Sequence, residues 1–184
     1  MDRKEFLKTA CGFGVCGCAL HFLGLFEPLH AAAATAEVPD QRLAFARYHV
    51  AKMVGFMAAG TTAPACAEIL EKTGRECAKL GQLNVKFKGD PDAYFAAARK
   101  TWGTDFSWDK EKGIVTVAVA EGECSCPLVD SKRTPAFFCN CSVGYQKEAF
   151  ETIFGKPVQV SLEKSKLGGS KRCVFEVTLS PAAK

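Results

Sequence analysis

Two closely spaced pairs of cysteines carry the clearest chemistry in this sequence. Cys124-Ser125-Cys126-Pro127 is followed, after a short interval, by Cys139-Asn140-Cys141. In an extended segment, residues two positions apart face the same side, so each pair can offer both sulfurs to one centre. Pro127 supports this geometry, because a proline favours an extended backbone in the residue before it. Thiolates arranged in this way suit zinc or an iron–sulfur cluster, so the spacing predicts a metal site.

A fifth sulfur belongs to the same candidate site, because Cys173 opens the last expected strand. The candidate metal ligands are therefore Cys124, Cys126, Cys139, Cys141 and Cys173. Ser142 can serve as the N-cap of a helix, which would place Cys139 and Cys141 just before a helix N-terminus, where the dipole favours thiolate. Disulfides between the two pairs, or inert buried thiols, are the alternatives to a metal.

The cysteine count bears on these alternatives. The chain has ten cysteines, and three of them (Cys11, Cys16 and Cys18) lie in the N-terminal segment, which leaves seven in the body. Seven is odd, so a body built only from disulfides would leave one thiol unpaired. Cys66 and Cys77 share a face of an expected helix but lie roughly 16 Å apart along its axis. We interpret these two as small buried hydrophobic residues.

The first 36 residues have the pattern of an export signal. Asp2-Arg3-Lys4-Glu5-Phe6-Leu7-Lys8 resembles a twin-arginine signal with Lys4 in place of the second arginine. The apolar stretch 10–26 is too short and too rich in glycine for a membrane-spanning helix, and Ala34-Thr35-Ala36 supplies small residues for cleavage. A lipid anchor at Cys18 is the alternative. We expect an exported protein of the periplasm or cell envelope, whose membrane contact is limited to this segment or a lipid anchor.

The remaining residues, 37–184, form a single expected domain. Helical periodicity and capping residues predict helices at 40–59, 64–80, 91–102 and 142–154. Runs rich in β-branched and aromatic residues predict strands at 104–108, 114–120, 158–162 and 173–179. Helices first, then strands with one intervening helix, predict an α+β fold with an antiparallel sheet of about four strands packed against about four helices.

The charge pattern excludes one class of partner. The net charge is only +4 and no long basic run occurs. A nucleic-acid-binding protein would need lysines and arginines clustered on one face, so no nucleic-acid partner is expected.

Several segments of the C-terminal third together resemble a known superfamily. They are Cys139-Asn140-Cys141-Ser142-Val143-Gly144-Tyr145, Phe150, Phe154-Gly155-Lys156-Pro157-Val158, Gly168-Gly169 and Cys173-Val174-Phe175. Over about the last 50 to 60 residues, the chain resembles the 4-vinyl reductase domain superfamily and the related L-2-amino-thiazoline-4-carboxylic acid hydrolase-like proteins.

This resemblance implies a small α+β ligand-binding fold. In some sensory relatives, a zinc site of cysteines and a carboxylate lies beside a pocket for an aromatic ligand. On that pattern Cys139 or Cys141 would bind the metal together with Cys173, and Glu163 is the nearest carboxylate. Ser165 stands where some relatives have cysteine, and Cys124 and Cys126 would compensate for it.

The expected function is therefore an exported domain that binds a small apolar or aromatic molecule and carries a cysteine site for zinc, or alternatively for an iron–sulfur cluster. The alternative is a hydrolase of a small cyclic amide-type substrate such as a thiazoline carboxylate, for which the sequence identifies no catalytic residue. A third interpretation is an envelope protein held by disulfides. The oligomeric state stays open, a homodimer included.

Overall fold

The helices begin where the sequence supplies capping residues. The computed structural model describes residues 40–180, so the export signal predicted for residues 1–36 lies outside the described part. The first three long helices are α2 (Gln41–Gly60), α3 (Ala63–Leu80) and α5 (Pro91–Trp102), preceded by Asp40, Thr62 and Asp90. Each of these cap residues accepts a hydrogen bond from a backbone N–H at the start of its helix, at 3.0, 3.4 and 3.0 Å. These predicted helices are confirmed.

The fourth long helix begins earlier than predicted. A 3₁₀ turn, η1 (Ala136–Cys139), leads directly into α6 (Asn140–Phe154), so Ser142 lies inside the first turn and is not the N-cap. The side-chain amide of Asn140 donates to the carbonyl of Phe137 at 2.7 Å, which ties the turn to the helix. The sequence also did not predict the short helix α4 (Gln82–Lys86). Both short elements lack the periodic apolar pattern that identifies a longer helix.

Four antiparallel strands form one sheet. They are β1 (Asp105–Asp109), β2 (Ile114–Ala118), β3 (Val158–Lys164) and β4 (Val174–Leu179), in the order β1-β2-β4-β3. The two central strands therefore come from distant parts of the sequence, with Val115 opposite Val177. A bulge interrupts the pairing of β3 with β4 between Leu162 and Lys164. The predicted α+β fold with an antiparallel sheet is confirmed.

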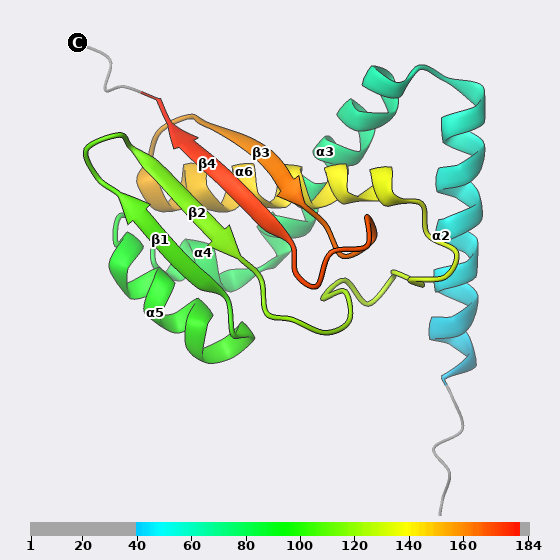
Figure 1. The fold of residues 1–184 in the computed structure, drawn as a ribbon, viewed down its shortest axis with the longest axis horizontal. Coiled ribbons are helices and arrows are strands. Elements are labelled where there is room, and N and C mark those ends of the chain that lie inside the picture. Colours follow the sequence, from blue (N-terminus) through cyan, green and yellow to red (C-terminus); the bar gives the residue numbers. More distant parts are fainter. Residues whose placement is uncertain (1–39, 181–184) are drawn as a thin grey trace, which may run out of the picture. The chain divides into compact units, whose positions relative to one another are not determined.

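One face of this sheet forms the main core. Alternate residues of β2 and β4 are buried there and pack against residues of α5 and α6. Figure 1 shows these two helices next to the sheet. The core contains an aromatic group in which Phe95 stacks on Phe106 with ring centroids 4.5 Å apart, and Phe150 has no exposed surface. The opposite face carries exposed polar residues such as Thr116 and Glu176. The alternation of buried and exposed residues is what a sheet with one solvated face requires.

Helices α3 and α6 approach each other at two glycines. A Cβ placed on Gly74 would lie 1.8 Å from the carbonyl oxygen of Cys141, and one on Gly144 would lie 1.8 Å from the carbonyl oxygen of Glu71. Such distances leave no room for any side chain, so both positions require glycine for the backbones to come this close. Beyond the contact, Arg75 binds Glu151 through two hydrogen bonds of 2.7 and 3.1 Å.

A smaller buried cluster joins α2 and α3 to the long loop that follows β2. Its buried members are Val54, Leu70, Val129 and Phe138. Arg47 on α2 also donates from Nε to the carbonyl oxygen of Pro127 at 2.7 Å. Among the helices of residues 40–180, none combines the length and the apolar character that crossing a membrane requires.

Candidate metal centre

Six of the seven cysteines in the described part lie near enough to affect the pKa of Cys126, Cys139 or Cys141, close to the start of α6. They come from four places: the loop after β2, the junction of η1 and α6, the residue just before β4, and α3. None of these seven cysteines takes part in a disulfide. The gathering includes all five predicted ligands and one cysteine, Cys77, that the prediction did not include.

The first group lies beside the connection from β3 to β4 and contains Cys124, Cys139 and Cys173. Cys139 is buried, and the pKa of its thiol is raised mainly by that burial and further by the nearby charges of Cys173 and Cys124. The hydroxyl of Ser165 contacts Cys139 and opposes this shift of the pKa. The backbone N–H of Lys166 points to the sulfur of Cys173 at 3.4 Å. Ser165 thus contacts Cys139, and its neighbour Lys166 contacts Cys173.

The second group lies between α3, the loop and the first turn of α6, and contains Cys77, Cys126 and Cys141. Cys126 and Cys141 are partly buried against the smaller cluster. Burial raises the pKa of the Cys141 thiol to about 12, and the charges of Cys77 and Cys126 add to the effect. Burial likewise raises the pKa of Cys126, with Cys124 and Cys77 contributing.

The two groups exist because the second cysteine pair is helical. Cys139 and Asn140 have α-helical backbone angles, with φ of −62° and −59°. In a helix each residue turns by about 100°, so residues two positions apart face nearly opposite directions. The prediction that this pair is extended was therefore wrong for Cys139 and Cys141. Cys139 faces the β3–β4 connection, and Cys141 faces α3.

Burial outweighs the helix dipole at this site. Cys139 and Cys141 lie at the N-terminal end of α6, where the dipole favours thiolate. The pKa values of both thiols are nevertheless raised, because loss of water penalises the charged form more strongly. Without a bound cation these two groups are therefore neutral thiols at neutral pH.

The described conformation brings the thiols near one another without fixing a coordination sphere. Within residues 40–180, no three His, Cys, Asp or Glu side chains form a group that could hold a metal ion as they stand. Cys124 and Cys126 belong to a segment, 119–135, without helix or strand. Metal coordination would therefore require this segment to move its sulfurs toward those of α6 and β4.

Two other side chains occupy positions that bear on the ligand set. Glu163, the nearest carboxylate in the resembled pattern, is exposed on β3 and accepts a hydrogen bond of 2.6 Å from Ser161. Cys66 is 3% exposed, as expected for a small buried residue, whereas Cys77 is exposed, contrary to our interpretation. Gly74 was the signal in the sequence that this part of α3 packs closely against another element, because a glycine within a helix often marks such packing.

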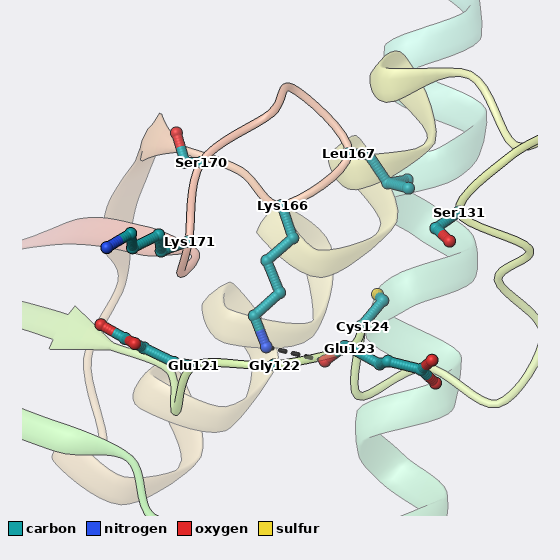
Figure 2. Close-up of a pocket in the computed structure, with 9 residues that line it drawn as sticks. All are labelled: Glu121, Gly122, Glu123, Cys124, Ser131, Lys166, Leu167, Ser170 and Lys171. Atoms are coloured by element: carbon teal, nitrogen blue, oxygen red, sulfur yellow. Dashed lines mark hydrogen bonds between the residues drawn. The ribbon is translucent and has the colours of Figure 1, made fainter.

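An open pocket of about 460 Å³ borders the first group. Figure 2 shows the nine residues that line it: Glu121, Gly122, Glu123, Cys124, Ser131, Lys166, Leu167, Ser170 and Lys171. The side chain of Lys166 reaches across from the β3–β4 connection and donates to the carbonyl oxygen of Glu123 at 2.7 Å, with Cys124 beside it. The pocket therefore combines an apolar wall, formed by Leu167 and Cys124, with charged groups of both signs.

The sequence comparisons match the part of the chain that carries the predicted ligands. The model of a family of unknown function, DUF6144, matches residues 99–184, which contain the sheet, α6 and all five predicted cysteines. Cys77 lies outside this match. No curated protein sequence matches the chain.

The chain is also similar to several solved structures. It is similar to a trafficking protein particle complex subunit 3 from Naegleria fowleri covalently bound to palmitic acid, with a TM-score of 0.51 and 15% identity, over 78% of this chain and 98% of that chain. This similarity shows a shared fold.

Two further structures are similar at lower scores. A vinyl-4-reductase family protein from Methanocaldococcus jannaschii has a TM-score of 0.40 and 16% identity, over 78% of this chain and 83% of that chain. The phenol-responsive sensory domain of the transcription activator PoxR with phenol has a TM-score of 0.29 and 12% identity, over 75% of this chain and 64% of that chain. A vinyl-4-reductase family protein is thus among the similar structures, and the narrower superfamily assignment stays a prediction.

Proposed function

We propose that this chain is a small-molecule-binding domain in which cysteine thiolates hold a zinc ion beside the ligand pocket, and that it reaches the cell envelope through the signal predicted in residues 1–36. The observation that carries the proposal is that Cys124 and Cys173 both lie near Cys139, and that Cys124 also lines the open pocket. Cys126 lies in the same loop as Cys124, and Cys141 lies in the first turn of α6, two residues after Cys139. These five residues are the proposed ligand set.

The chemistry of the group favours a soft cation. Thiols that are partly or fully buried give up hydration, and a bound zinc ion compensates by converting them to coordinated thiolates. The loop that carries Cys124 and Cys126 is joined to α2 by the hydrogen bond between Arg47 and Pro127 but contains no helix or strand. A metal would therefore order the segment with the least regular structure. An iron–sulfur cluster uses the same ligand type and is the alternative occupant.

The pocket suggests the kind of ligand. Its apolar wall suits a small apolar or aromatic body, and Lys171 stands exposed at its edge. Lys166 is already engaged with the backbone of Glu123, so Lys171 is the cation more available to an acidic group on a ligand. We therefore propose a small aromatic or apolar molecule that carries an acidic substituent.

Elemental analysis of protein purified under reducing conditions tests the metal, together with a count of free thiols. We expect zinc in the wild-type chain, and loss of zinc in the Cys139→Ser and Cys173→Ser variants. Cys66→Ala is the matched control, because Cys66 is a buried cysteine outside both groups. Protein without metal, with its thiols paired as disulfides, would overturn the proposal in favour of a disulfide-held protein.

An anionic naphthalene sulfonate dye tests the pocket, because it combines an aromatic body with an acidic group. We expect Lys171→Glu to weaken binding of the dye, whereas Lys112→Glu, a change of the same charge in the exposed turn between β1 and β2, should not. Turnover of a thiazoline carboxylate by the zinc-loaded wild type, lost in Cys139→Ser, would instead assign the hydrolase function.

A further inference from the structure

Helix α2 carries apolar residues on two opposite sides. One side includes Val54 and packs against α3 and the loop after β2 through the smaller cluster. The other side carries Phe45, Met53 and Phe56, which are 68%, 55% and 74% exposed. Because each residue turns a helix by about 100°, these three residues, the outward stripe, lie together on the side away from Val54. Figure 1 shows α2 at the border of the fold, away from the sheet. An exposed apolar patch of this kind commonly marks an interaction site or a membrane contact.

Tyr48 borders the outward stripe and contacts cations from two elements. The Nζ atom of Lys52 on α2 lies 5.6 Å from the centre of the Tyr48 ring. The guanidinium of Arg133, from the loop after β2, lies 5.8 Å from the same ring. Lys52 also stands four positions before Phe56, so its side chain lies beside the stripe. Cations and exposed apolar residues thus share one surface.

The charge of this surface is mostly positive. Helix α2 contains three basic residues and no Asp or Glu, and both Arg42 and Lys52 are exposed. Asp40, which caps the helix, and Asp130, which pairs with Arg133 at 3.4 Å, offset part of this charge. The exposed cations therefore favour a negatively charged partner.

A second copy of this chain fits the surface poorly. Two such helices side by side share a strip about 30 Å long and about 10 Å wide, which buries roughly 600 Å² in total, whereas a stable interface needs about 1,000 Å² or more. Pairing would also bring together two helices that carry only positive charges. An anionic lipid surface accommodates both features, because aromatic rings enter the boundary of the acyl chains while lysine and arginine reach the phosphates.

We propose that the outward stripe of α2, with Arg42, Lys52 and Arg133 at its border, binds an anionic phospholipid surface, with the helix lying in the plane of the interface. This contact is separate from the signal in residues 1–36 and does not depend on the proposed metal. In an exported protein it would keep the domain at the membrane after the signal is cleaved.

Co-sedimentation of the full chain with lipid vesicles tests the contact. We expect binding to vesicles of phosphatidylglycerol and phosphatidylcholine in equal parts, and weaker binding to phosphatidylcholine alone or at higher salt. Phe56→Ser should weaken binding to the mixed vesicles about tenfold, and Lys52→Gln about fivefold. Leu80→Ser changes a residue that is 82% exposed at the far end of α3, and Lys112→Gln changes an exposed lysine in a turn. Both controls should bind like wild type.

Fluorescence quenching separates this contact from any binding by residues 1–36. Phe56→Trp places a fluorophore in the outward stripe, and lipids brominated on their acyl chains should quench it when the chain binds. Leu80→Trp should show no such added quenching. Equal quenching in the two variants would overturn the proposal, as would equal binding of wild type and Phe56→Ser.

Two further measurements define what a failure would mean. A wild-type dimer that Phe56→Ser converts to a monomer, measured by light scattering, would overturn the lipid contact in favour of self-association. Zinc content should be the same in Phe56→Ser as in wild type, so the loss of lipid binding leaves the proposed function intact. Far-UV circular dichroism establishes that the variants compared are folded.

Discussion

The aromatic core under the sheet and the cysteine region at the start of α6 are stabilised in different ways. The core has large side chains such as Phe150 and Phe175 buried between regular elements, and its aromatic rings contact one another directly. The cysteine region depends on the four-residue cluster around Leu70, and much of it is the irregular segment 119–135. Packing alone can hold the first region. In the second region, thiols gather where a bound cation would add stability that packing does not supply.

The largest effect is expected from a change in the core. Phe150→Ala removes a side chain with no exposed surface and should reduce the free energy of unfolding by about 3–5 kcal/mol. Urea denaturation followed by circular dichroism measures this loss. The loss should be nearly equal with and without zinc, because Cys173 is the one candidate ligand that packs against this core. A loss that depends on zinc would show that the two regions are coupled.

Zinc itself should give the next largest effect. If the cysteine region binds the ion only when folded, free zinc at a hundred times its Kd should raise the free energy of unfolding by about 2.7 kcal/mol. The comparison is between denaturation curves recorded with zinc and with a chelator. Cys139→Ser should lose most of this gain, whereas Phe150→Ala should keep it. Equal stability of wild type under both conditions would contradict a role for the metal in holding this region.

The contact between α3 and α6 joins the two regions and gives an intermediate effect. Gly144→Ala would place a Cβ within 1.8 Å of a backbone oxygen, so the two helices must separate. This separation should reduce the free energy of unfolding by an amount near the upper end of about 1–3 kcal/mol. Gly55→Ala is the matched control, because no atom lies within 4 Å of its Cβ position in α2. That control should stabilise the protein by about 0.5–1 kcal/mol. Thermal unfolding of both variants measures the difference.

The smallest effect is expected at the ion pair beside this contact, and it depends on pH. The hydrogen bonds from Arg75 stabilise the charged carboxylate of Glu151 in the folded protein. They therefore lower the pKa of Glu151 in the folded state. The pair therefore stabilises the fold above the unfolded pKa of about 4.3, and this contribution disappears as the pH falls through the lower folded pKa. Arg75→Ala should lose about 1 kcal/mol at neutral pH, allowing for partial screening by solvent.

The same variant provides its own test across pH. The gap in unfolding free energy between Arg75→Ala and wild type should narrow below pH 4 and remain constant between pH 6 and 8, values chosen to lie on either side of the carboxyl titration. A gap that stays unchanged into acid would mean that Arg75 contributes through packing of its side chain instead of its charge.

The sequence predicted most of the fold because its boundaries are marked by local chemistry. Asp90 followed by Pro91 specifies the start of α5, and Gly155 specifies the end of α6, where φ is +65°. The strands were predicted because β-branched residues are concentrated in segments such as Ile114–Ala118. Such signals act over a few residues and need no knowledge of the partner elements.

The candidate site was less predictable because it depends on contacts between distant segments. The backbone of Cys139 was expected to be extended, but the 3₁₀ turn after Pro135 carries it into a helix and separates its sulfur from that of Cys141. Cys77 was interpreted as buried because its spacing from Cys66 places both on one helix face. Only the crossing of α6 at Gly74 shows that the two cysteines have different neighbours.

The bulge between Leu162 and Lys164 has a consequence for self-association. β3 and β1 are the outer strands of the sheet, and an outer strand presents unpaired backbone groups to which another chain can add. The bulge breaks the regular spacing of those groups on β3, and the exposed charges of Glu163 and Lys164 flank it. On the other side, β1 is only five residues long and carries Asp105 at its start. Both borders thus discourage strand-by-strand aggregation.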